Sequence, residues 1–183
     1  TIRLWDVTAG RELKRITGHQ GTVYDVVFAP SGEQLASVSV DRTARLWDVQ
    51  SGQEMGRLEG HEGDVLKVDF SPNGRLLATA STDRTARLWD VDRLREVRRF
   101  QGTDAWVTDV SFSPDSRRLV VSRKGKPIRL WDLDVERGNR SLQGHAGPVN
   151  DVSLSLARNK IFTASDDKTV PIWNPTSKKR VFE

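Results

Sequence analysis

The sequence predicts an all-β protein built from repeated four-stranded antiparallel units. The first observation is a Trp-Asp dipeptide that returns every 42 residues. The second is a period-2 alternation of apolar and polar residues in short segments, which is typical of strands. The third is that short turns join these segments without any useful helical period, as in an antiparallel meander. The dipeptide stands at Trp5-Asp6, Trp47-Asp48, Trp89-Asp90 and Trp131-Asp132, and Trp173-Asn174 closes the series.

Residues 18–59 show how the elements of one unit follow from the sequence. Gly18-His19 opens the unit, and the apolar residues from Val23 to Phe28 predict the first strand. Ala29-Pro30-Ser31-Gly32 predicts a tight turn, because Pro fixes φ and Gly accepts a positive φ. Further strands are predicted from Leu35 to Val40, from Ala44 to Asp48 and from Glu54 to Leu58, with a hairpin at Asp41-Arg42.

The other units match the pattern of residues 18–59 to different degrees. Residues 1–17 hold only two predicted strands around the Thr8-Ala9-Gly10 turn, which correspond to the third and fourth strands of a unit. Residues 60–101 repeat the pattern closely, and stretches 41–49 and 83–91 are both DRTARLWDV. Residues 144–183 return to the pattern. We expect Pro171 to lie inside the third strand of this last unit, where it removes a ladder donor.

Residues 102–143 diverge most from the repeat. Thr103 stands where the other units have His, and Gly125 stands where they have Asp. Val121 and Arg123 replace small hydroxyl residues of the second strand, while Trp131-Asp132 is retained. This combined loss indicates relaxed local constraint or a specialised unit.

Taken together, the aligned Gly-His, Ser-Pro-x-Gly, Asp-x-Thr and Trp-Asp elements resemble the WD-repeat β-propeller family over essentially the whole chain. The near-identical repeats are most similar to bacterial multi-repeat WD proteins, whose propeller is often attached to a longer regulatory chain. The resemblance implies one domain, a partial propeller of four full blades plus an N-terminal half blade. Its expected parts are a half blade at 1–17, WD blades at 18–59 and 60–101, a divergent WD blade at 102–143, and a WD blade at 144–183.

The half blade raises the question of closure. Closed WD propellers usually have seven or eight blades, and open blade edges expose unpaired backbone. We therefore expect the chain to be a segment of a longer propeller, completed by blades of the same parent chain. Completion by another copy and an open arc are the alternatives.

The resemblance also implies a hydrogen-bond network inside each regular blade. In the family, a loop His, a hydroxyl of strand two, the hairpin Asp and the Trp bond to one another, as buried polar groups must. The hydroxyl partner stays open between Ser37 and Ser39, Thr79 and Ser81, and Thr163 and Ser165. The matching sets are His19, Asp41 and Trp47; His61, Asp83 and Trp89; and His145, Asp167 and Trp173.

Composition and motifs argue against catalysis in this chain. There is no Cys, so neither a disulfide nor a thiolate metal site is possible. The three His residues occupy equivalent positions in different units, too dispersed for one metal site. Nucleophile-elbow, P-loop and H-E-x-x-H motifs are absent. We expect no enzyme activity, no cofactor and no metal. No apolar run approaches the roughly 18 residues of a membrane span, and a cytoplasmic location is expected.

A protein or peptide partner is expected on the face formed by the loops before strand one and between strands two and three. Trp106 is the one Trp off the ladder and Tyr24 the only Tyr, and aromatic and Arg residues anchor interfaces. The alternative for Trp106 is packing against the divergent blade. The candidate partner-binding residues are Trp106, Tyr24, Leu66, Arg123, Lys124 and Lys126.

The sequence therefore predicts a non-catalytic protein–protein interaction platform, a scaffold or sensor module of a larger signalling protein. The alternative is nucleic-acid binding through a basic face. The chain has 29 Lys and Arg against 25 Asp and Glu, a net charge of +4. Because this excess is small and spread over all units, solvated strand faces explain most of it.

Overall fold

The computed structural model of the chain describes residues 1–101, 104–134, 139–142, 144–155, 160–174 and 180–182. These residues form strands joined by turns, and none of them belongs to a helix that could cross a membrane. The strands are β1 (Ile2–Asp6), β2 (Arg11–Ile16), β3 (Val23–Phe28), β4 (Gln34–Ser39), β5 (Ala44–Asp48), β6 (Glu54–Leu58), β7 (Val65–Phe70), β8 (Leu76–Ser81), β9 (Ala86–Asp90), β10 (Arg95–Phe100), β11 (Val107–Phe112), β12 (Arg118–Arg123), β13 (Lys126–Asp132), β14 (Asn139–Leu142), β15 (Val149–Ser155), β16 (Lys160–Ser165), β17 (Ile172–Trp173) and β18 (Arg180–Phe182).

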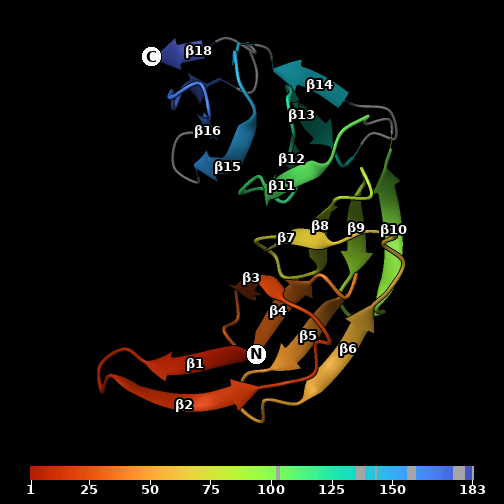
Figure 1. Cartoon of the computed structure of the whole chain (residues 1–183), viewed down its shortest axis with the longest axis vertical. Helices are drawn as coiled ribbons and strands as arrows, with labels where there is room; N and C mark the ends of the chain where they lie inside the picture. Colours follow the sequence, from red (N-terminus) through yellow and green to blue (C-terminus); the bar gives the residue numbers. More distant parts are fainter. Residues whose placement is uncertain (102–103, 135–138, 143, 156–159, 175–179, 183) are drawn as a thin grey trace.

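The strands form four antiparallel four-stranded sheets and one two-stranded sheet, β1–β2. In each large sheet, consecutive strands pair in chain order. Figure 1 shows these sheets following one another as blades along an arc, with the innermost strands β3, β7, β11 and β15 on the concave side. The predicted fold class, an all-β partial propeller with four full blades and an N-terminal half blade, is therefore confirmed.

Each blade boundary is a layer of apolar side chains. Between the first and second full blades, Ala36, Val38 and Leu46 pack against Phe70 and Trp89. All five are at most 5 % exposed. The same arrangement repeats at the next two boundaries. Residues of the second and third strands of one blade thus pack closely against Phe, Trp and aliphatic residues of the next.

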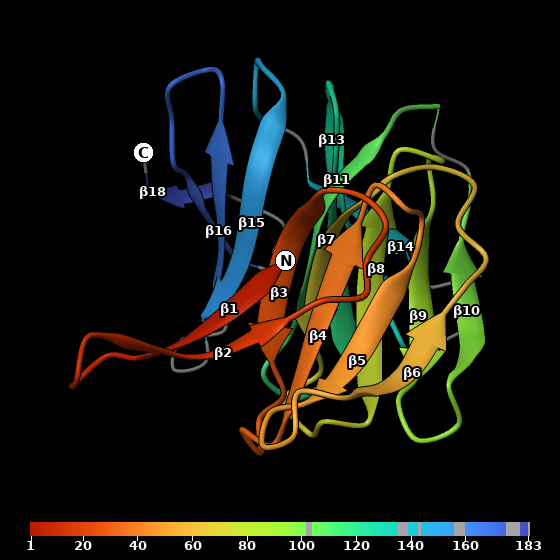
Figure 2. The same ribbon diagram turned by 60° about the horizontal axis from the view of Figure 1, so that its bottom comes forward.

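The half blade packs on the first full blade through its apolar side. Ile2 and Ile16 contact Leu35 and Trp47 in one buried cluster. The turn between β1 and β2 projects away from the other sheets, as Figures 1 and 2 show. Trp5, which takes the ladder position of Trp47, is 53 % exposed because no blade precedes it in the structure.

The two ends of the arc expose faces that are buried elsewhere. Val26 and Phe28 of β3 are 45 % and 52 % exposed, whereas the equivalent Val68 and Phe70 are each 5 % exposed. At the other end, Val170 is 63 % exposed, whereas the equivalent Ala44 is 1 % exposed. The N-terminal end therefore shows the first-strand side of a blade boundary, and the C-terminal end shows the opposite side, where Phe162 and Val170 stand at the positions of Ala36 and Ala44.

The last blade departs from the prediction at Pro171. The expected third strand around Pro171 is wrong, since β17 contains only Ile172–Trp173 and Pro171 precedes it. Pro cannot donate to the sheet ladder, so the strand begins after it.

The third blade has a shorter hairpin than the other blades, because only Lys124 and Gly125 separate β12 from β13, and Gly125 takes a φ of +66°. Loss of the Asp-x-Thr segment there allows a tighter hairpin.

Candidate partner-binding face

The loop face is held by a polar network that the second full blade shows most completely. His61 Nε2 lies 2.7 Å from Thr79 Oγ1, and His61 Nδ1 lies 2.7 Å from Asp83. Trp89 Nε1 donates to the same Thr79 hydroxyl at 2.9 Å. Because the indole only donates, the Thr79 hydroxyl accepts from it and donates to His61 Nε2. His61 Nδ1–H then donates to Asp83, so the contacts define the tautomer.

The first and fourth full blades repeat this geometry. Thr79 is matched by Ser37 in the first blade and by Thr163 in the fourth, each in contact with its His and Trp at 2.7 to 2.9 Å. The residue two positions further on has a different role, since Ser39 Oγ accepts the Asp41 amide N–H at 3.1 Å. The structure thus brings together His19, Asp41 and Trp47; His61, Asp83 and Trp89; and His145, Asp167 and Trp173.

Charges around the network favour neutral His and ionised Asp. Burial lowers the pKa of His61 and outweighs its hydrogen bond to Asp83. Burial opposes ionisation of Asp83, but hydrogen bonds from His61, Thr85 and the Glu62 amide hold its pKa well below its usual range. Arg87 donates to Glu96 at 2.8 Å and contacts Asp83 at 3.5 Å. The buried Arg87 therefore has two counter-charges inside its blade.

The third blade replaces this network with a buried Arg. Arg123 is 4 % exposed, and its Nη2 donates to the Pro127 carbonyl at 2.5 Å. Its Nε has no hydrogen-bond partner among the described residues. Thr103, which stands at the His position, lies outside the described residues. The ring centroids of Trp131 and Phe100 lie 5.0 Å apart.

The loops on this face share one register in all four blades. The amide of Val40 donates to Thr22, and the amide of Lys124 donates to Trp106 in the same way, at 3.0 and 2.9 Å. The Asp64–Thr82 and Pro148–Asp166 pairs repeat the bond at 3.0 Å. Residues before strand one therefore lie beside residues before the hairpin, as the family resemblance implies.

Trp106 is 47 % exposed at its position on the loop face. The Lys124 ammonium lies 4.6 Å from its ring centroid, a cation–π contact. The Lys126 ammonium forms an ion pair with Asp104 at 2.6 Å. Trp106, Lys124 and Lys126 thus come from the same blade as the buried Arg123.

Tyr24 and Leu66 lie on other blades. Tyr24 is on β3 and 49 % exposed, and Leu66 occupies the equivalent position on β7, where it is partly buried. No contact joins either of them directly to Trp106 among the interactions of the described residues. The candidate residues therefore follow the inner rim of the arc, with their basic members gathered on the third blade.

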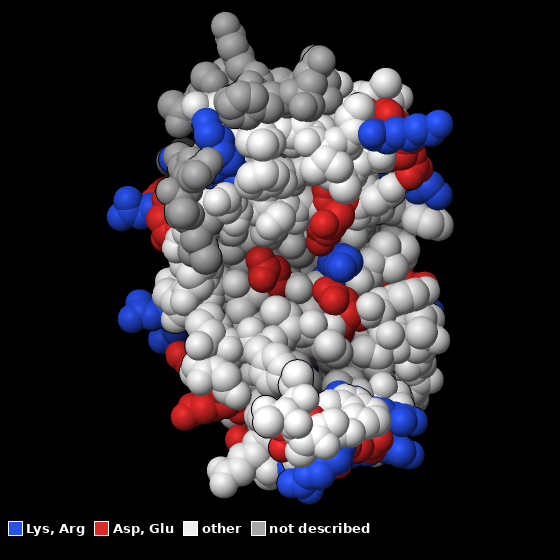
Figure 3. All heavy atoms as spheres, turned by 90° about the vertical axis from the view of Figure 1, so that its left-hand side faces the viewer, with Lys and Arg blue, Asp and Glu red and all other residues white. Residues whose placement is uncertain are grey.

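Carboxylates on the inner strands form a feature that the sequence analysis missed. Asp25 accepts the Val68 amide at 3.2 Å, Asp69 the Phe112 amide at 2.8 Å, and Asp109 the Val152 amide at 2.8 Å. Each bond links one blade to the next. Figure 3 shows acidic side chains around a basic one in the middle of this face. The sequence did contain a signal for these links, namely Asp residues about one repeat apart on the first strand of successive blades.

Burial perturbs two of these carboxylates. It raises the pKa of Asp69 to about 6, despite hydrogen bonds from the Phe112 and Phe70 amides. The pKa of Asp109 is also raised, by burial first and then by a side-chain hydrogen bond with Asp151. A protonated Asp109 thus donates to Asp151 while it accepts the Val152 amide.

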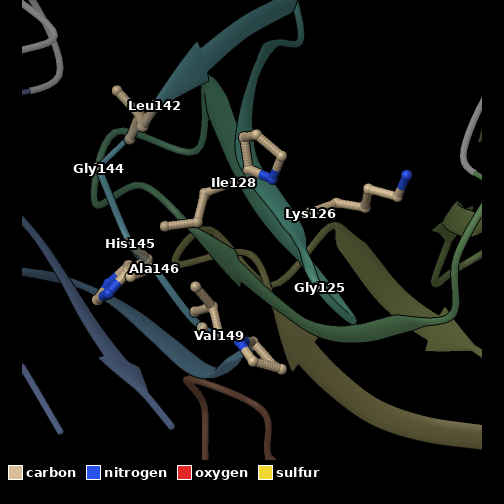
Figure 4. A pocket seen from close by; sticks show the side chains of 11 residues that line it. Gly125, Lys126, Ile128, Leu142, Gly144, His145, Ala146 and Val149 are labelled. Carbon is tan, nitrogen blue, oxygen red and sulfur yellow. The ribbon is translucent and has the colours of Figure 1, made fainter. Parts of the chain in front are cut away.

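A cleft of about 430 Å³ separates the third and fourth blades. Figure 4 shows the hairpin from Gly125 to Ile128 on one side and the segment from Gly144 to Val149 on the other. Its walls are mostly apolar or backbone, and Lys126 extends away from it. Among the described residues, no cluster of three or more His, Asp or Glu side chains is arranged to hold a metal ion.

Comparison with known families gives four matches to the model described as "WD domain, G-beta repeat". The matches cover residues 10–48, 52–90, 94–132 and 138–174. Each matched segment begins near the outer strand of one blade and ends with the third strand of the next. Domains of this family are generally non-catalytic modules that bind proteins.

Individual relatives match over single repeats. Coronin-7 of Rattus norvegicus is 46 % identical over 41 residues, which is 22 % of this chain and 4 % of that protein. A periodic tryptophan protein 2 homolog of Neurospora crassa is 49 % identical over 43 residues, 24 % of this chain and 5 % of that protein. The nuclear distribution protein nudF 2 of Talaromyces marneffei is also 49 % identical over 43 residues, 24 % of this chain and 9 % of that protein. The matches therefore span less than a tenth of each relative.

Proposed function

Because the chain belongs to the WD-repeat family, we propose that it is a non-catalytic platform for protein–protein interaction, a cytoplasmic scaffold or sensor module of a larger signalling protein. The observation that carries the proposal is Trp106, a large aromatic side chain that is 47 % exposed on the loop face. Aromatic residues with this exposure are typical interface anchors. The contact with Lys124 holds the ring in place before a partner arrives.

The blades supply the rigidity that such a platform needs. The His–Asp–hydroxyl–Trp networks fix the loops of the regular blades, and the loop register is shared by all four. A partner segment would lie across the inner rim, with Trp106 and Tyr24 as anchors and Leu66 between their blades. A preformed surface binds with a smaller ordering cost than a flexible one.

The proposal is tested by Trp106→Ala in the full-length protein. A photo-crosslinking amino acid at position 106 first identifies the partner, and titration then measures its affinity. We expect Trp106→Ala to weaken binding about tenfold or more, with little change in melting temperature. Met55→Ala is the matched control, because Met55 is similarly exposed at 48 % but lies on the outer strand β6 of a full blade. Unchanged binding with a large loss of stability would mean that Trp106 is a packing residue.

Nucleic-acid binding has less support. Arg45 and Arg87 are buried and paired with carboxylates inside their blades. The inner strands also carry the carboxylates of Asp25 and Asp69, which would repel a polyanion at neutral pH. This alternative predicts an affinity for DNA or RNA that falls steeply with salt.

We also propose that further blades cover the two open ends of the arc, from the same parent chain or from another copy. The exposure of Val26 and Phe28 supports this, since their equivalents in the other blades are buried.

A further inference from the structure

The third blade has a positive charge where the regular blades have a hydroxyl. Arg123 occupies the position of Ser39 and Ser81, which accept the amide of the hairpin Asp. Arg123 is 4 % exposed, and no carboxylate of the described residues forms an ion pair with it. Its Nε is the buried donor without a partner. Asp104 attracts the Arg123 guanidinium without forming an ion pair with it, so this buried charge is only partly compensated.

The carboxylates that serve this purpose in other blades are missing from the sequence here. Asp83 and Glu96 hold Arg87 in the second blade. Gly125 and Gly138 stand at their positions in the third blade. The equivalent of Arg87 is Arg129, whose guanidinium lies 5.9 Å from the centroid of the Trp131 ring. Arg129 adds a second positive charge near Arg123, and the two repel each other.

The surface above these charges presents two more cations. Lys124 is exposed and lies against the Trp106 ring. Lys126 is balanced only by Asp104, whose side chain is 70 % exposed, and such exposed pairs contribute little energy. Because charges inside a protein are screened by salt less than exposed ones, Arg123 adds to the potential above the blade without touching a partner.

From this geometry we infer that the loop face of the third blade binds an acidic segment of a protein partner. Glu or Asp side chains of that segment lie against Lys124 and Lys126, and Trp106 packs against an adjoining apolar residue. Arg123 is a positioning charge beneath the contact. This inference rests on the proposed function and specifies the chemistry of the partner.

The charge pattern favours a short acidic peptide over nucleic acid. In the other blades, the exposed cation of the same hairpin, Arg42, Arg84 or Lys168, directly follows the hairpin Asp, which the third blade lacks. At the same loop positions, the neighbouring blades carry Asp64 and the exposed Asp166. A phosphate backbone that extended beyond the third blade would meet these carboxylates, whereas one or two carboxylates of a peptide would not. Complementary charges of limited extent give specificity of this kind.

The test is fluorescence anisotropy of the full chain with a fluorescein-labelled Gly-Ser peptide that contains four Glu residues. The same peptide with Gln in place of Glu and a single-stranded DNA oligonucleotide of equal length are the comparison probes. We expect binding of the Glu peptide only, weakened about fivefold by Arg123→Ser and by Lys124→Gln. Ser is the residue of the regular blades at this position, so Arg123→Ser is expected to fold, and thermal melting checks it.

Asp104→Asn provides a gain-of-affinity test that needs no loss of structure. Removal of this competitor for Lys126 should strengthen peptide binding about threefold. Glu62→Gln is the matched control, because Glu62 occupies the equivalent loop position of the second blade. Equal binding of the Glu and Gln peptides, tighter binding of DNA, or no effect of Arg123→Ser and Asp104→Asn would overturn the inference. A cognate partner that still depends on Trp106 in that case would leave the proposed platform function intact.

Discussion

At the scale of single residues, the hydroxyl in each network shows where sequence reasoning stops. The repeat aligns Thr79 and Ser81 equally well with the family pattern. Both point to the same side of β8, because residues two apart in a strand share a face. Only the reach of the Trp89 indole and the His61 ring selects Thr79. Alternation identifies the face, but side-chain packing in three dimensions selects the position.

The central role of this hydroxyl leads to a stability prediction. Thr79→Val keeps the side-chain shape but removes the acceptor of Trp89 and the donor to His61. Two buried polar groups then lose their partner, so we expect the free energy of unfolding to fall by about 2–3 kcal/mol. Urea denaturation measures the loss. Thr8→Val, at an exposed position in the N-terminal turn, should change stability by less than about 0.5 kcal/mol. Similar effects of both variants would show that the network contributes little.

At the scale of strands, the regular blades follow the sequence closely and the exceptions have local causes. β3 to β10 lie where alternation and turn residues predict them. β17 is shorter because Pro171 cannot join the ladder. The repeat pattern predicts that a strand is present there, but it does not predict how far Pro171 shortens it. The carboxylate links between blades were missed for another reason. Lys67 stands one repeat after Asp25, and the link is made by Asp69 instead, so the motif shifts between blades.

The link made by Asp69 predicts an unusual pH dependence. Its pKa is raised to about 6 in the folded state from an ordinary 3.8. A carboxyl with a raised folded pKa contributes fully below pH 3.8, and its contribution is lost as the pH rises towards 6. Asn does not titrate and still offers an oxygen to the Phe112 amide. The difference in unfolding free energy between Asp69→Asn and the wild type should therefore shift in favour of the variant by up to about 3 kcal/mol between pH 4 and 7.

Denaturant titrations of both proteins across this range provide the measurement. A difference that stays constant with pH would show that Asp69 ionises normally in the folded chain. Wild-type stability alone does not decide the question, because His61, with its lowered pKa, contributes in the opposite direction as the pH rises through 6.5.

At the scale of the whole molecule, the repeat predicts the blades and their order, since each Trp marks one blade boundary. The buried position of the positive charge in the third blade could be recognised only from the structure. Arg123 looked like a surface residue next to Lys124 and Lys126 in the sequence, yet it is buried beneath them. A residue-type pattern does not report whether a charged residue in place of the Ser39 and Ser81 hydroxyls lies at the surface or inside the blade.

An open end of the arc and a closed blade boundary give a matched pair of variants. Phe28 and Phe112 occupy the same position in different blades, but they are 52 % and 4 % exposed. We expect Phe112→Gln to cost about 3–5 kcal/mol of unfolding free energy, because it removes a side chain from a packed boundary. Phe28→Gln should cost less than about 1 kcal/mol and should reduce self-association in light scattering. Equal destabilisation by both variants would indicate that the open face is covered in solution.

The unlike ends also restrict how copies of this chain can join. A blade boundary joins two different faces, the first-strand side of one blade and the opposite side of its neighbour. A contact between copies that repeats this packing is therefore heterologous, with head meeting tail. Such a contact has no built-in partner number: it yields a ring when the rotation per copy divides a full circle and a helical fibre when it does not. The polarity of a single blade boundary thus sets the symmetry of any assembly that repeats this boundary between copies.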